Sequence, residues 1–310
     1  MSMKVLFMGT PDISAQCLKA ILAAGHNVVG VVTQPDKPKG RGYEMAMPEV
    51  KKYALLKGID VYQPETLKDG AILPLLEKYN PDIIIVVAYG KILPEYILNF
   101  PPYGCINIHG SLLPRYRGAA PIQRAVIDGE EKSGVTSMYM EKGLDTGDML
   151  LKEEVIITPD MTAGELHDIL AEAGGKVLLK TLDEAENKTL KPEKQDDSLS
   201  TYAAQLSKAE GEIDWNQDAQ TIINKVRGLN PWPMAYTFLG GKRVVIDKCT
   251  LSDLSANAGE VISASKDGLI VGCKTKSVVI ENIKIEGKKK MSVEDYLRGH
   301  TIEKGTILGR

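Results

Sequence analysis

Apolar and amphipathic segments alternate along the first part of the chain. Residues 4–9, 27–34 and 82–90 are largely apolar, and the last of these has seven apolar residues in succession. Between the first two runs, apolar side chains recur with helical spacing at Ile13, Cys17, Leu18, Ile21 and Leu22. Strands that are apolar throughout are typical of a parallel sheet that is covered on both faces. With a further strand at 104–110, residues 1–188 predict a doubly wound, mostly parallel, Rossmann-like α/β domain.

The pattern changes after this domain. Residues 183–201 are polar and contain no aromatic residue, which is typical of a solvated helix end followed by a linker. We place this linker at 189–206. Beyond it, short apolar strands are separated by turns at residues 240–241 and 267–268. This spacing predicts a small OB-like β-barrel within a second domain at 207–310.

Length and charge narrow the classes of protein that fit. A chain of 310 residues is long for one hydrophobic core, so two domains are expected. No apolar run reaches the roughly 18 residues that a bilayer span needs, and the chain enters its first strand without a leader segment. We therefore expect a cytoplasmic protein without a membrane partner, and a monomer. The net charge of −3 argues against wholesale nucleic-acid binding, but residues 207–310 carry 16 Lys and Arg against 13 Asp and Glu. That excess permits a polyanionic partner, although simple solvation explains it equally well.

Several common sites lack their sequence signatures. The first strand is followed by GTPD rather than G-x-G-x-x-G, which disfavours a dinucleotide, and there is no phosphate-binding loop for a nucleoside triphosphate. The four cysteines, Cys17, Cys105, Cys249 and Cys273, lie far apart without a C-x-x-C pair. We therefore expect buried, reduced thiols. Neither HExxH nor a Cys/His cluster is present, so no metal is expected.

Two polar residues interrupt the strand at 104–110. Asn107 and His109 are two residues apart and share one face of the strand, opposite to Ile106 and Ile108. Ligands of doubly wound sheets bind beyond the C-terminal ends of the strands, where this pair lies. An isolated histidine in a core is usually structural, but the strand end and the adjacent amide favour a functional pair here.

An acidic turn supplies a third candidate. Asp145 lies between Gly143 and Gly147, and such glycines allow the backbone to approach a ligand closely. On its own this is an ordinary turn. Together, an amide donor, an imidazole and a carboxylate could move the proton of a nucleophilic amine and stabilise an oxyanion during acyl transfer.

A basic loop at 34–52 is a candidate contact for nucleic acid. It contains Lys37, Lys39 and Arg41 among prolines and glycines. Such a loop is often simply solvated, but a cationic loop also releases counterions when it meets a phosphate backbone. Arg115 and Arg117 follow the Asn107 and His109 strand and could either orient an anion or contact solvent.

These motifs together resemble the methionyl-tRNA formyltransferases, a family within the folate-dependent formyltransferase superfamily. The resemblance extends over essentially the whole chain and rests on FMGTPD, TQPDKPKGRG, VVAYGKILP, NIHGSLLPRYRGAAPI, GLDTGDML, LSKAEGEIDW and GLNPWPMAYT. The Asn-x-His and SLLP segments are typical of the superfamily, whereas PRYRGAAPI, the PDKPKGRG loop and NPWP are specific to the tRNA enzymes.

The resemblance implies transfer of the formyl group of 10-formyltetrahydrofolate to the α-amine of methionine on initiator methionyl-tRNA. It implies that Asn107 and His109 stabilise the oxyanion and that Asp145 holds the imidazole or relays protons through water. It assigns the basic loop to the acceptor end of the tRNA and the C-terminal barrel to the tRNA body. The residues that it implies for the folate site are Ala88, Tyr89, Gly90, Ile92, Leu93, Ser111, Leu112, Leu113, Pro114, Tyr139 and Asp145.

Two other hypotheses remain open at this point. The same chemistry could serve a small amine, such as an amino sugar or glycinamide ribotide, although the basic loop and basic C-terminal domain count against it. A non-catalytic nucleic-acid-binding protein would also account for the charge, but it leaves the three polar residues without a purpose.

Overall fold

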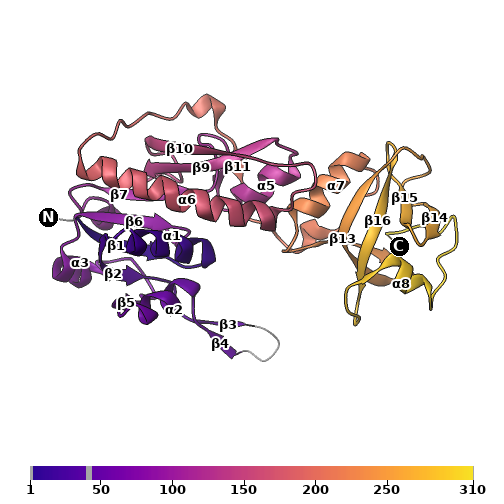
Figure 1. Cartoon of the computed structure of the whole chain (residues 1–310), viewed down its shortest axis with the longest axis horizontal. Coiled ribbons are helices and arrows are strands. Elements are labelled where there is room, and N and C mark those ends of the chain that lie inside the picture. Colours follow the sequence, from indigo (N-terminus) through magenta and orange to yellow (C-terminus); the bar gives the residue numbers. More distant parts are fainter. Residues whose placement is uncertain (1–2, 40–43, 310) are drawn as a thin grey trace. The chain divides into compact units, whose positions relative to one another are not determined.

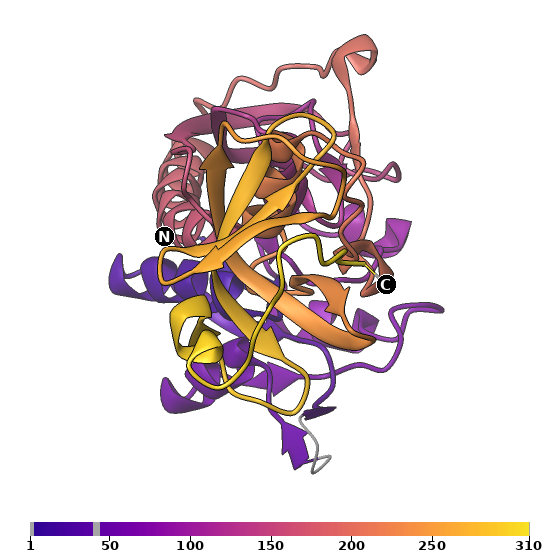
Figure 2. The same ribbon diagram turned by 90° about the vertical axis from the view of Figure 1, so that its right-hand side faces the viewer.

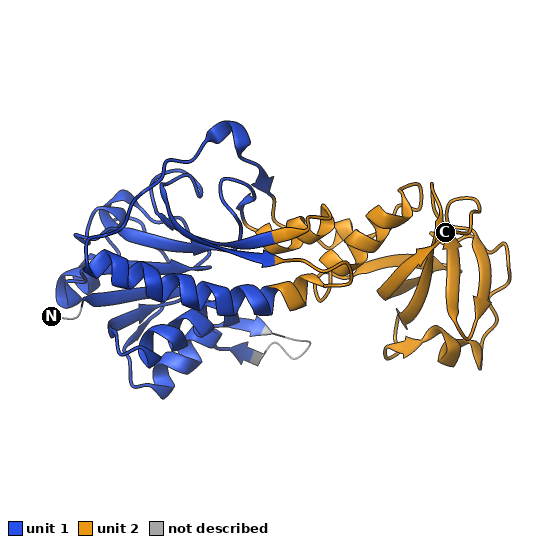
Figure 3. Ribbon diagram, turned by 45° about the horizontal axis from the view of Figure 1, so that its top comes forward, with its two compact units in different colours: residues 1–118, 133–155, 167–203 blue, residues 119–132, 156–166, 204–310 orange. Residues whose placement is uncertain are grey.

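The computed structural model describes residues 3–39 and 44–309 of the chain. These residues form two compact units (Figure 3). Unit 1 comprises residues 1–118, 133–155 and 167–203, and unit 2 comprises residues 119–132, 156–166 and 204–310. Each unit therefore gathers segments that are separate in the sequence.

A seven-stranded sheet forms the centre of unit 1, in the order β10-β9-β7-β6-β1-β2-β5 (Figure 1). Its strands are β1 (Lys4–Gly9), β2 (Asn27–Val32), β5 (Val61–Tyr62), β6 (Ile83–Val87), β7 (Cys105–His109), β9 (Lys132–Tyr139) and β10 (Met149–Ile156). The first five of these are parallel, and β9 runs antiparallel to β7. The mostly parallel, doubly wound sheet that the sequence predicts is confirmed.

The direction in which strands are added to the sheet reverses between β1 and β6. From β1 the chain adds β2 and β5 on one side, and it then returns to add β6 and β7 on the other. Such a switch point is the usual ligand-binding edge of a doubly wound sheet. The two strand ends are joined there, because the Thr10 hydroxyl donates to the Tyr89 carbonyl at 3.2 Å.

The helices of unit 1 are α1 (Asp12–Ala23), α2 (Glu49–Leu56), α3 (Leu73–Tyr79), α4 (Glu95–Leu98) and most of α6 (Ala163–Glu186). α1 buries the apolar stripe that the sequence predicts. Two adjacent glycines let α6 approach it closely. A Cβ atom at Gly175 would lie 3.2 Å from the Cβ of Ala20, and one at Gly174 would lie 3.5 Å from the Sγ of Cys17.

Unit 1 also holds short strands outside its main sheet. The basic loop contains β3 (Lys37–Lys39) and β4 (Glu44–Ala46), which pair antiparallel. Within the segment expected as a linker, β11 (Tyr202–Ala203) pairs with β8 (Arg117–Gly118), and a 3-10 helix, η1, spans Asp197–Leu199. This segment is therefore hydrogen-bonded to the rest of unit 1 over part of its length.

Unit 2 is built around an antiparallel sheet in the order β12-β13-β16-β15-β14, with β17 paired to β16. Its strands are β12 (Ala235–Leu239), β13 (Lys242–Ser252), β14 (Val261–Ser265), β15 (Gly268–Gly272), β16 (Ser277–Ile285) and β17 (Met291–Ser292). Its helices are α5 (Pro121–Ile127), η2 (Ala209–Gly211), α7 (Ala219–Gly228) and α8 (Val293–Leu297). The turn at residues 240–241 lies where the sequence predicts it. The second turn lies at 266–267, one residue earlier than expected, because Gly268 already begins β15.

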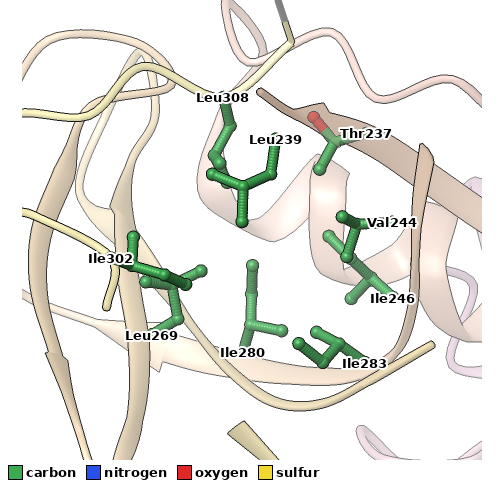
Figure 4. Close-up of a pocket in the computed structure, with 9 residues that line it drawn as sticks. All are labelled: Thr237, Leu239, Val244, Ile246, Leu269, Ile280, Ile283, Ile302 and Leu308. Carbon is green, nitrogen blue, oxygen red and sulfur yellow. The ribbon is translucent and has the colours of Figure 1, made fainter. Parts of the chain in front are cut away.

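The last residues of the chain join the two edges of this sheet. The amide of Val261 donates to the carbonyl of Thr306 at 2.8 Å, and Leu308 donates to Gly259 at the same distance, beside β14. The amide of Gly309 donates to Phe238 of β12 at 2.9 Å. These bonds link the two edges around an apolar interior (Figure 4), which is consistent with an OB-like barrel. Its lining consists of Thr237, Leu239, Val244, Ile246, Leu269, Ile280, Ile283, Ile302 and Leu308.

All four cysteines are buried and free, as the sequence predicts. Burial raises the pKa of Cys17, Cys105 and Cys249 to about 12, and that of Cys273 to about 11. The thiols are therefore protonated at neutral pH. Among residues 3–39 and 44–309, no helix combines the length and apolarity that crossing a bilayer requires.

We predict that Leu308→Ala destabilises unit 2, because it empties part of the barrel interior and loosens residues 306–309, which link the two edges of the sheet. A leucine-to-alanine change at a buried site costs about 2–5 kcal/mol of unfolding free energy. Both tryptophans, Trp215 and Trp232, belong to unit 2, so tryptophan fluorescence during urea unfolding reports on this unit. The matched control is Leu251→Ala, since Leu251 is 44% exposed. Equal urea midpoints for Leu308→Ala and Leu251→Ala would contradict this role of Leu308.

Candidate active site

β7 ends in two polar side chains. Asn107 and His109 face one side of the sheet because side chains two residues apart along a strand point the same way. Asn107 lies opposite Val86 of β6 and Met138 of β9. Both polar side chains are largely buried, with Asn107 9% and His109 6% exposed. Groups buried to this degree require hydrogen-bond partners within the protein.

One ring nitrogen of His109 is hydrogen-bonded to the main chain, and the other faces Asp145. Its Nε2 lies 2.8 Å from the carbonyl oxygen of Tyr116. A carbonyl can only accept, so Nε2 carries a hydrogen and donates. Nδ1 lies 3.7 Å from Oδ2 of Asp145, and it is the nitrogen left to exchange a proton with a substrate.

Asp145 occupies a left-handed backbone conformation between β9 and β10, with φ of +54°. Its Oδ2 accepts a hydrogen bond of 2.8 Å from the amide of Gly118, and its Oδ1 accepts a longer one, of 3.5 Å, from Nδ2 of Asn107. The carboxylate is 12% exposed. It is therefore partly withdrawn from water but retains donors on both oxygens.

Gly147 allows the Asp145 turn to lie close to β9. A Cβ atom at this position would lie 1.9 Å from the carbonyl oxygen of Tyr139, which is shorter than any van der Waals contact. The glycine is required by this close approach rather than by an unusual backbone angle.

Three segments that are distant in the sequence therefore meet at one point. The sequence reasoning nominated Asn107, His109 and Asp145, and the structure brings these three side chains together. A neutral amide donor, an imidazole with a free nitrogen and a carboxylate can together move a proton and stabilise charge on an oxygen. Among the described residues, no group of three or more His, Cys, Asp or Glu could hold a metal ion.

The candidate folate residues after β6 divide into an exposed and a buried set. Ala88, Gly90 and Ile92 are exposed, whereas the side chains of Tyr89 and Leu93 pack in the apolar core between the sheet and its helices. The carbonyl of Tyr89 accepts a hydrogen bond from Gln34 in addition to that from Thr10. These two hydrogen bonds fix the loop at Tyr89, while Ala88, Gly90 and Ile92 remain exposed. Burial, together with the neighbouring Tyr96, raises the pKa of Tyr89 to about 12.

The remaining candidate folate residues lie beside β7. The hydroxyl of Ser111 donates to the carbonyl of Arg115 at 2.7 Å, and the amide of Leu113 donates to Thr136 at 3.1 Å. Leu113 packs with Met138 and Met149. Leu112 is half-buried, and Pro114 follows it after a cis peptide bond. Tyr139, at the end of β9, is half-buried, and burial raises its pKa.

Two of the candidate tRNA residues, Lys37 and Lys39, lie in β3. Lys37 is exposed and Lys39 ends β3. Arg41 lies outside the described residues. Below the hairpin, Lys51 forms an ion pair with Asp36 at 2.7 Å, and Gln63 donates to the same carboxylate. These bonds, led by those from Lys51, hold the pKa of Asp36 below its usual value.

Sequence reasoning missed the residues that hold Asp145 and His109 in place. Gly118 binds the carboxylate through its amide, and Thr201 accepts from the amide of Tyr116 at 2.8 Å. Gln195 binds the main chain of the Asp145 turn. Arg117, for which the sequence left anion binding and solvent contact open, pairs with Asp197 at 2.7 Å. Main-chain donors and a glutamine inside a polar segment leave no mark on the hydrophobic pattern.

Comparison with known proteins identifies the family. The family model described as "Formyl transferase" matches residues 3–182, and the one described as "Formyl transferase, C-terminal domain" matches residues 205–301. The first match covers the whole Rossmann-like sheet, and the second covers the strands of the antiparallel barrel. The chain belongs to the formyl transferase family.

Relatives of this chain have a more particular name. Methionyl-tRNA formyltransferases from Alkaliphilus metalliredigens and Alkaliphilus oremlandii are each 50% identical to it over 309 residues. These alignments cover 99% of this chain and 98% and 100% of the two relatives. A methionyl-tRNA formyltransferase from Geobacter metallireducens is 47% identical over 307 residues, which is 99% of each chain.

Solved structures with lower identity share the fold. WlaRD, a sugar 3N-formyl transferase solved with dTDP and 5-N-formyl-THF, gives a TM-score of 0.68 at 19% identity, over 93% of this chain and all of its own. HypX from Aquifex aeolicus, in complex with tetrahydrofolic acid, gives 0.66 at 18% identity, over 96% of this chain and 47% of its own. The mostly parallel sheet followed by an antiparallel sheet is therefore shared well beyond the similar sequences.

We predict that Gly147→Ala displaces the Asp145 turn, because the added methyl would overlap the Tyr139 carbonyl. Overpacking of this kind costs about 1–3 kcal/mol, which corresponds to roughly tenfold or more in local opening. The readout is amide hydrogen exchange at Gly118, whose N–H donates to Asp145, and we expect it to accelerate. Gly299→Ala is the control, because a Cβ there would meet no atom within 4 Å. Unchanged exchange at Gly118 in Gly147→Ala would show that the turn does not depend on this close approach.

Proposed function

We propose that the protein transfers the formyl group of 10-formyltetrahydrofolate to the α-amine of methionine on initiator methionyl-tRNA. The observation that carries this proposal is the meeting of Asn107 and His109 with Asp145, at 3.5 Å and 3.7 Å from its carboxylate oxygens, in a chain 50% identical to methionyl-tRNA formyltransferases over 99% of its length. The sequence pattern also favours these three residues for acyl transfer.

The geometry supports separate roles for the three side chains. The amine attacks the formyl carbon, a C–N bond forms, and negative charge develops on the formyl oxygen until the bond to the folate nitrogen breaks. Nδ2 of Asn107 can donate to that oxygen. Nδ1 of His109 can take up the amine proton and donate it onward, because Nε2 is committed to Tyr116. The proton finally replaces the formyl group on the departing folate nitrogen, directly or through water.

Asp145 supports the cationic form of the imidazole. Its Oδ2 faces Nδ1 at 3.7 Å, so protonation of His109 creates an ion pair. The Gly118 amide fixes the same oxygen, which keeps the carboxylate in place while the proton moves. A carboxylate that is already oriented does not need to reorganise during the reaction.

The folate is proposed to bind along the loop after β6 and beside β7. A pterin ring presents several hydrogen-bonding groups on a flat surface, and the exposed main chain of Ala88 and Gly90 suits it. The half-buried Tyr139 and the Ser111–Pro114 segment lie beside β7, within the same unit. These residues remain the proposed site: Ala88, Tyr89, Gly90, Ile92, Leu93, Ser111, Leu112, Leu113, Pro114, Tyr139 and Asp145.

The tRNA is proposed to contact the basic hairpin and the C-terminal barrel. Lys37, Lys39 and Arg41 would meet the acceptor end, and the basic excess of residues 207–310 would meet the tRNA body. We further propose a catalytic domain at 1–188 and a tRNA-binding domain at 207–310, joined by residues 189–206. In solution we propose a cytoplasmic monomer.

A small amine as the acceptor is the competing function. Its support is the shared fold of the sugar formyl transferase WlaRD, at 19% identity. The discriminating experiment follows tetrahydrofolate release with 10-formyltetrahydrofolate and either charged initiator tRNA or free small amines. Release with the tRNA alone supports the proposal, release with a small amine alone replaces it, and no release with any amine refutes formyl transfer.

We predict that His109→Ala lowers kcat by about 10²-fold or more, because the reaction loses a proton acceptor and an oxyanion donor. The Kd for tRNA and for folate should stay within a few-fold of wild type. His167→Ala is the matched control, since this partly exposed histidine pairs with Asp12 and Asp168 and not with Asp145. Near-normal turnover with tenfold weaker tRNA binding would contradict the catalytic role.

We predict that Arg41→Ala raises the KM for tRNA without changing the KM for folate. Loss of one phosphate contact should reduce the slope of log K against log salt by about 0.7–0.9. The measurement is steady-state kinetics across a salt series, with Lys152→Ala on β10 as the control for loss of an exposed cation. Identical salt slopes for Arg41→Ala and wild type would remove the basic loop from tRNA binding.

A further inference from the structure

We infer that Gln195 is a positioning residue for Asp145, and that the segment expected as a linker forms part of the active-site wall. This inference rests on the proposed formyl transfer. Gln195 is 5% exposed, although it lies in a polar segment and its neighbours Lys194 and Asp196 are exposed. A solvated linker has no reason to bury one glutamine, because burying an amide costs free energy unless its hydrogen bonds are made.

The side-chain amide of Gln195 donates both of its hydrogens to the Asp145 turn. Nε2 donates to the carbonyl of Asp145 at 2.8 Å and to the carbonyl of Gly147 at 2.7 Å. These two carbonyls bracket the turn, so a single side chain fixes its main chain on both sides of Thr146. The left-handed backbone of Asp145 is a conformation that a non-glycine residue holds only when its surroundings impose it.

The oxygen of Gln195 connects the turn to the opposite wall of the site. Oε1 accepts from Nε of Arg117 at 3.0 Å, and Arg117 also pairs with Asp197. The next residue, Gly118, donates its amide to the Asp145 carboxylate at 2.8 Å. Gly118 thus holds the carboxylate of Asp145 directly, and Arg117 holds its main chain indirectly, through Gln195.

The same segment also supports His109. Thr201 accepts from the amide of Tyr116 at 2.8 Å, and its carbonyl accepts from the amide of Arg117 at 2.9 Å. Tyr116 is the residue whose carbonyl binds Nε2 of His109. Residues 195–201 therefore fix both the carboxylate and the imidazole without touching either side chain.

The approach of the turn explains why such a support is needed. β9 runs antiparallel to β7, and the amide of Met140 donates to the carbonyl of Cys105, at the start of β7. The chain must then fold back along β7 to bring Asp145 to Asn107 and His109. A segment that doubles back in this way has no strand partner at Asp145, so Gln195 supplies the hydrogen bonds that a ladder would otherwise make.

The test compares Gln195→Ala and Gln195→Met with wild type in formylation of charged initiator tRNA. Methionine keeps the buried volume but cannot donate, so it separates hydrogen bonding from packing. We expect kcat to fall about 10-fold or more in both variants, since a displacement of about 1 Å in a catalytic group can cost 10²-fold. The KM values for folate and tRNA should stay within about threefold. Glu193→Ala is the matched control, because Glu193 is exposed and bonds Met149 only through its main chain.

A double-mutant comparison distinguishes positioning from general support. If Gln195 acts through Asp145, Gln195→Ala should change kcat less than about twofold in an Asp145→Asn background, where the carboxylate is already lost. A full multiplicative loss in that background would overturn the inference. So would wild-type kcat in both Gln195 variants, or loss of cooperative thermal unfolding in both, which would make Gln195 a residue of general stability. A wild-type protein without formyl transfer to any amine would instead refute the proposed function.

Discussion

The position of one partly buried carboxylate governs the arrangement of the active site. In the proposed reaction Asp145 forms an ion pair with His109 after proton uptake, yet a charge withdrawn from water is costly unless donors surround it. The amides of Gly118 and Asn107 supply those donors. Every unusual feature nearby serves this placement, from the left-handed backbone of Asp145 to the contact that excludes a side chain at Gly147.

The sheet provides the fixed side of the arrangement. β7 lies two places from β1 and next to β6, so its C-terminal end lies beside the switch point of the parallel sheet. Buried strands on both sides leave Asn107 and His109 little freedom to move. The other side is the turn after β9, which reaches the same point from an antiparallel neighbour and relies on side chains from residues 195–201. In the proposed reaction the buried strand carries the groups that meet the substrate, and the supported turn carries the carboxylate that pairs with the protonated imidazole.

Much of this could be predicted from the sequence, and the part that could not has a common cause. Side chains alternate along a β-strand with a period of two residues, so Asn107 and His109 can be assigned to one face without knowledge of the partner strands. The apolar run at 82–90 predicts a strand that is buried on both faces. Asp145 could be nominated because glycines mark its turn. The antiparallel direction of β9, the partner of Arg117 and the burial of Gln195 depend on contacts between residues that are far apart in the chain. A polar segment such as 189–206 has the same composition whether it is solvated or hydrogen-bonded to a site.

The most direct test of the central claim measures the coupling between His109 and Asp145 in single-turnover formyl transfer. The rates required are those of His109→Ala, Asp145→Asn and the double variant, with saturating folate and charged initiator tRNA. In the proposed reaction the Asp145 carboxylate acts through the His109 imidazole. The double variant should therefore be at most about twofold slower than His109→Ala alone. A double variant slowed by the product of the two single effects would show that the two side chains act independently, and would contradict the arrangement described here.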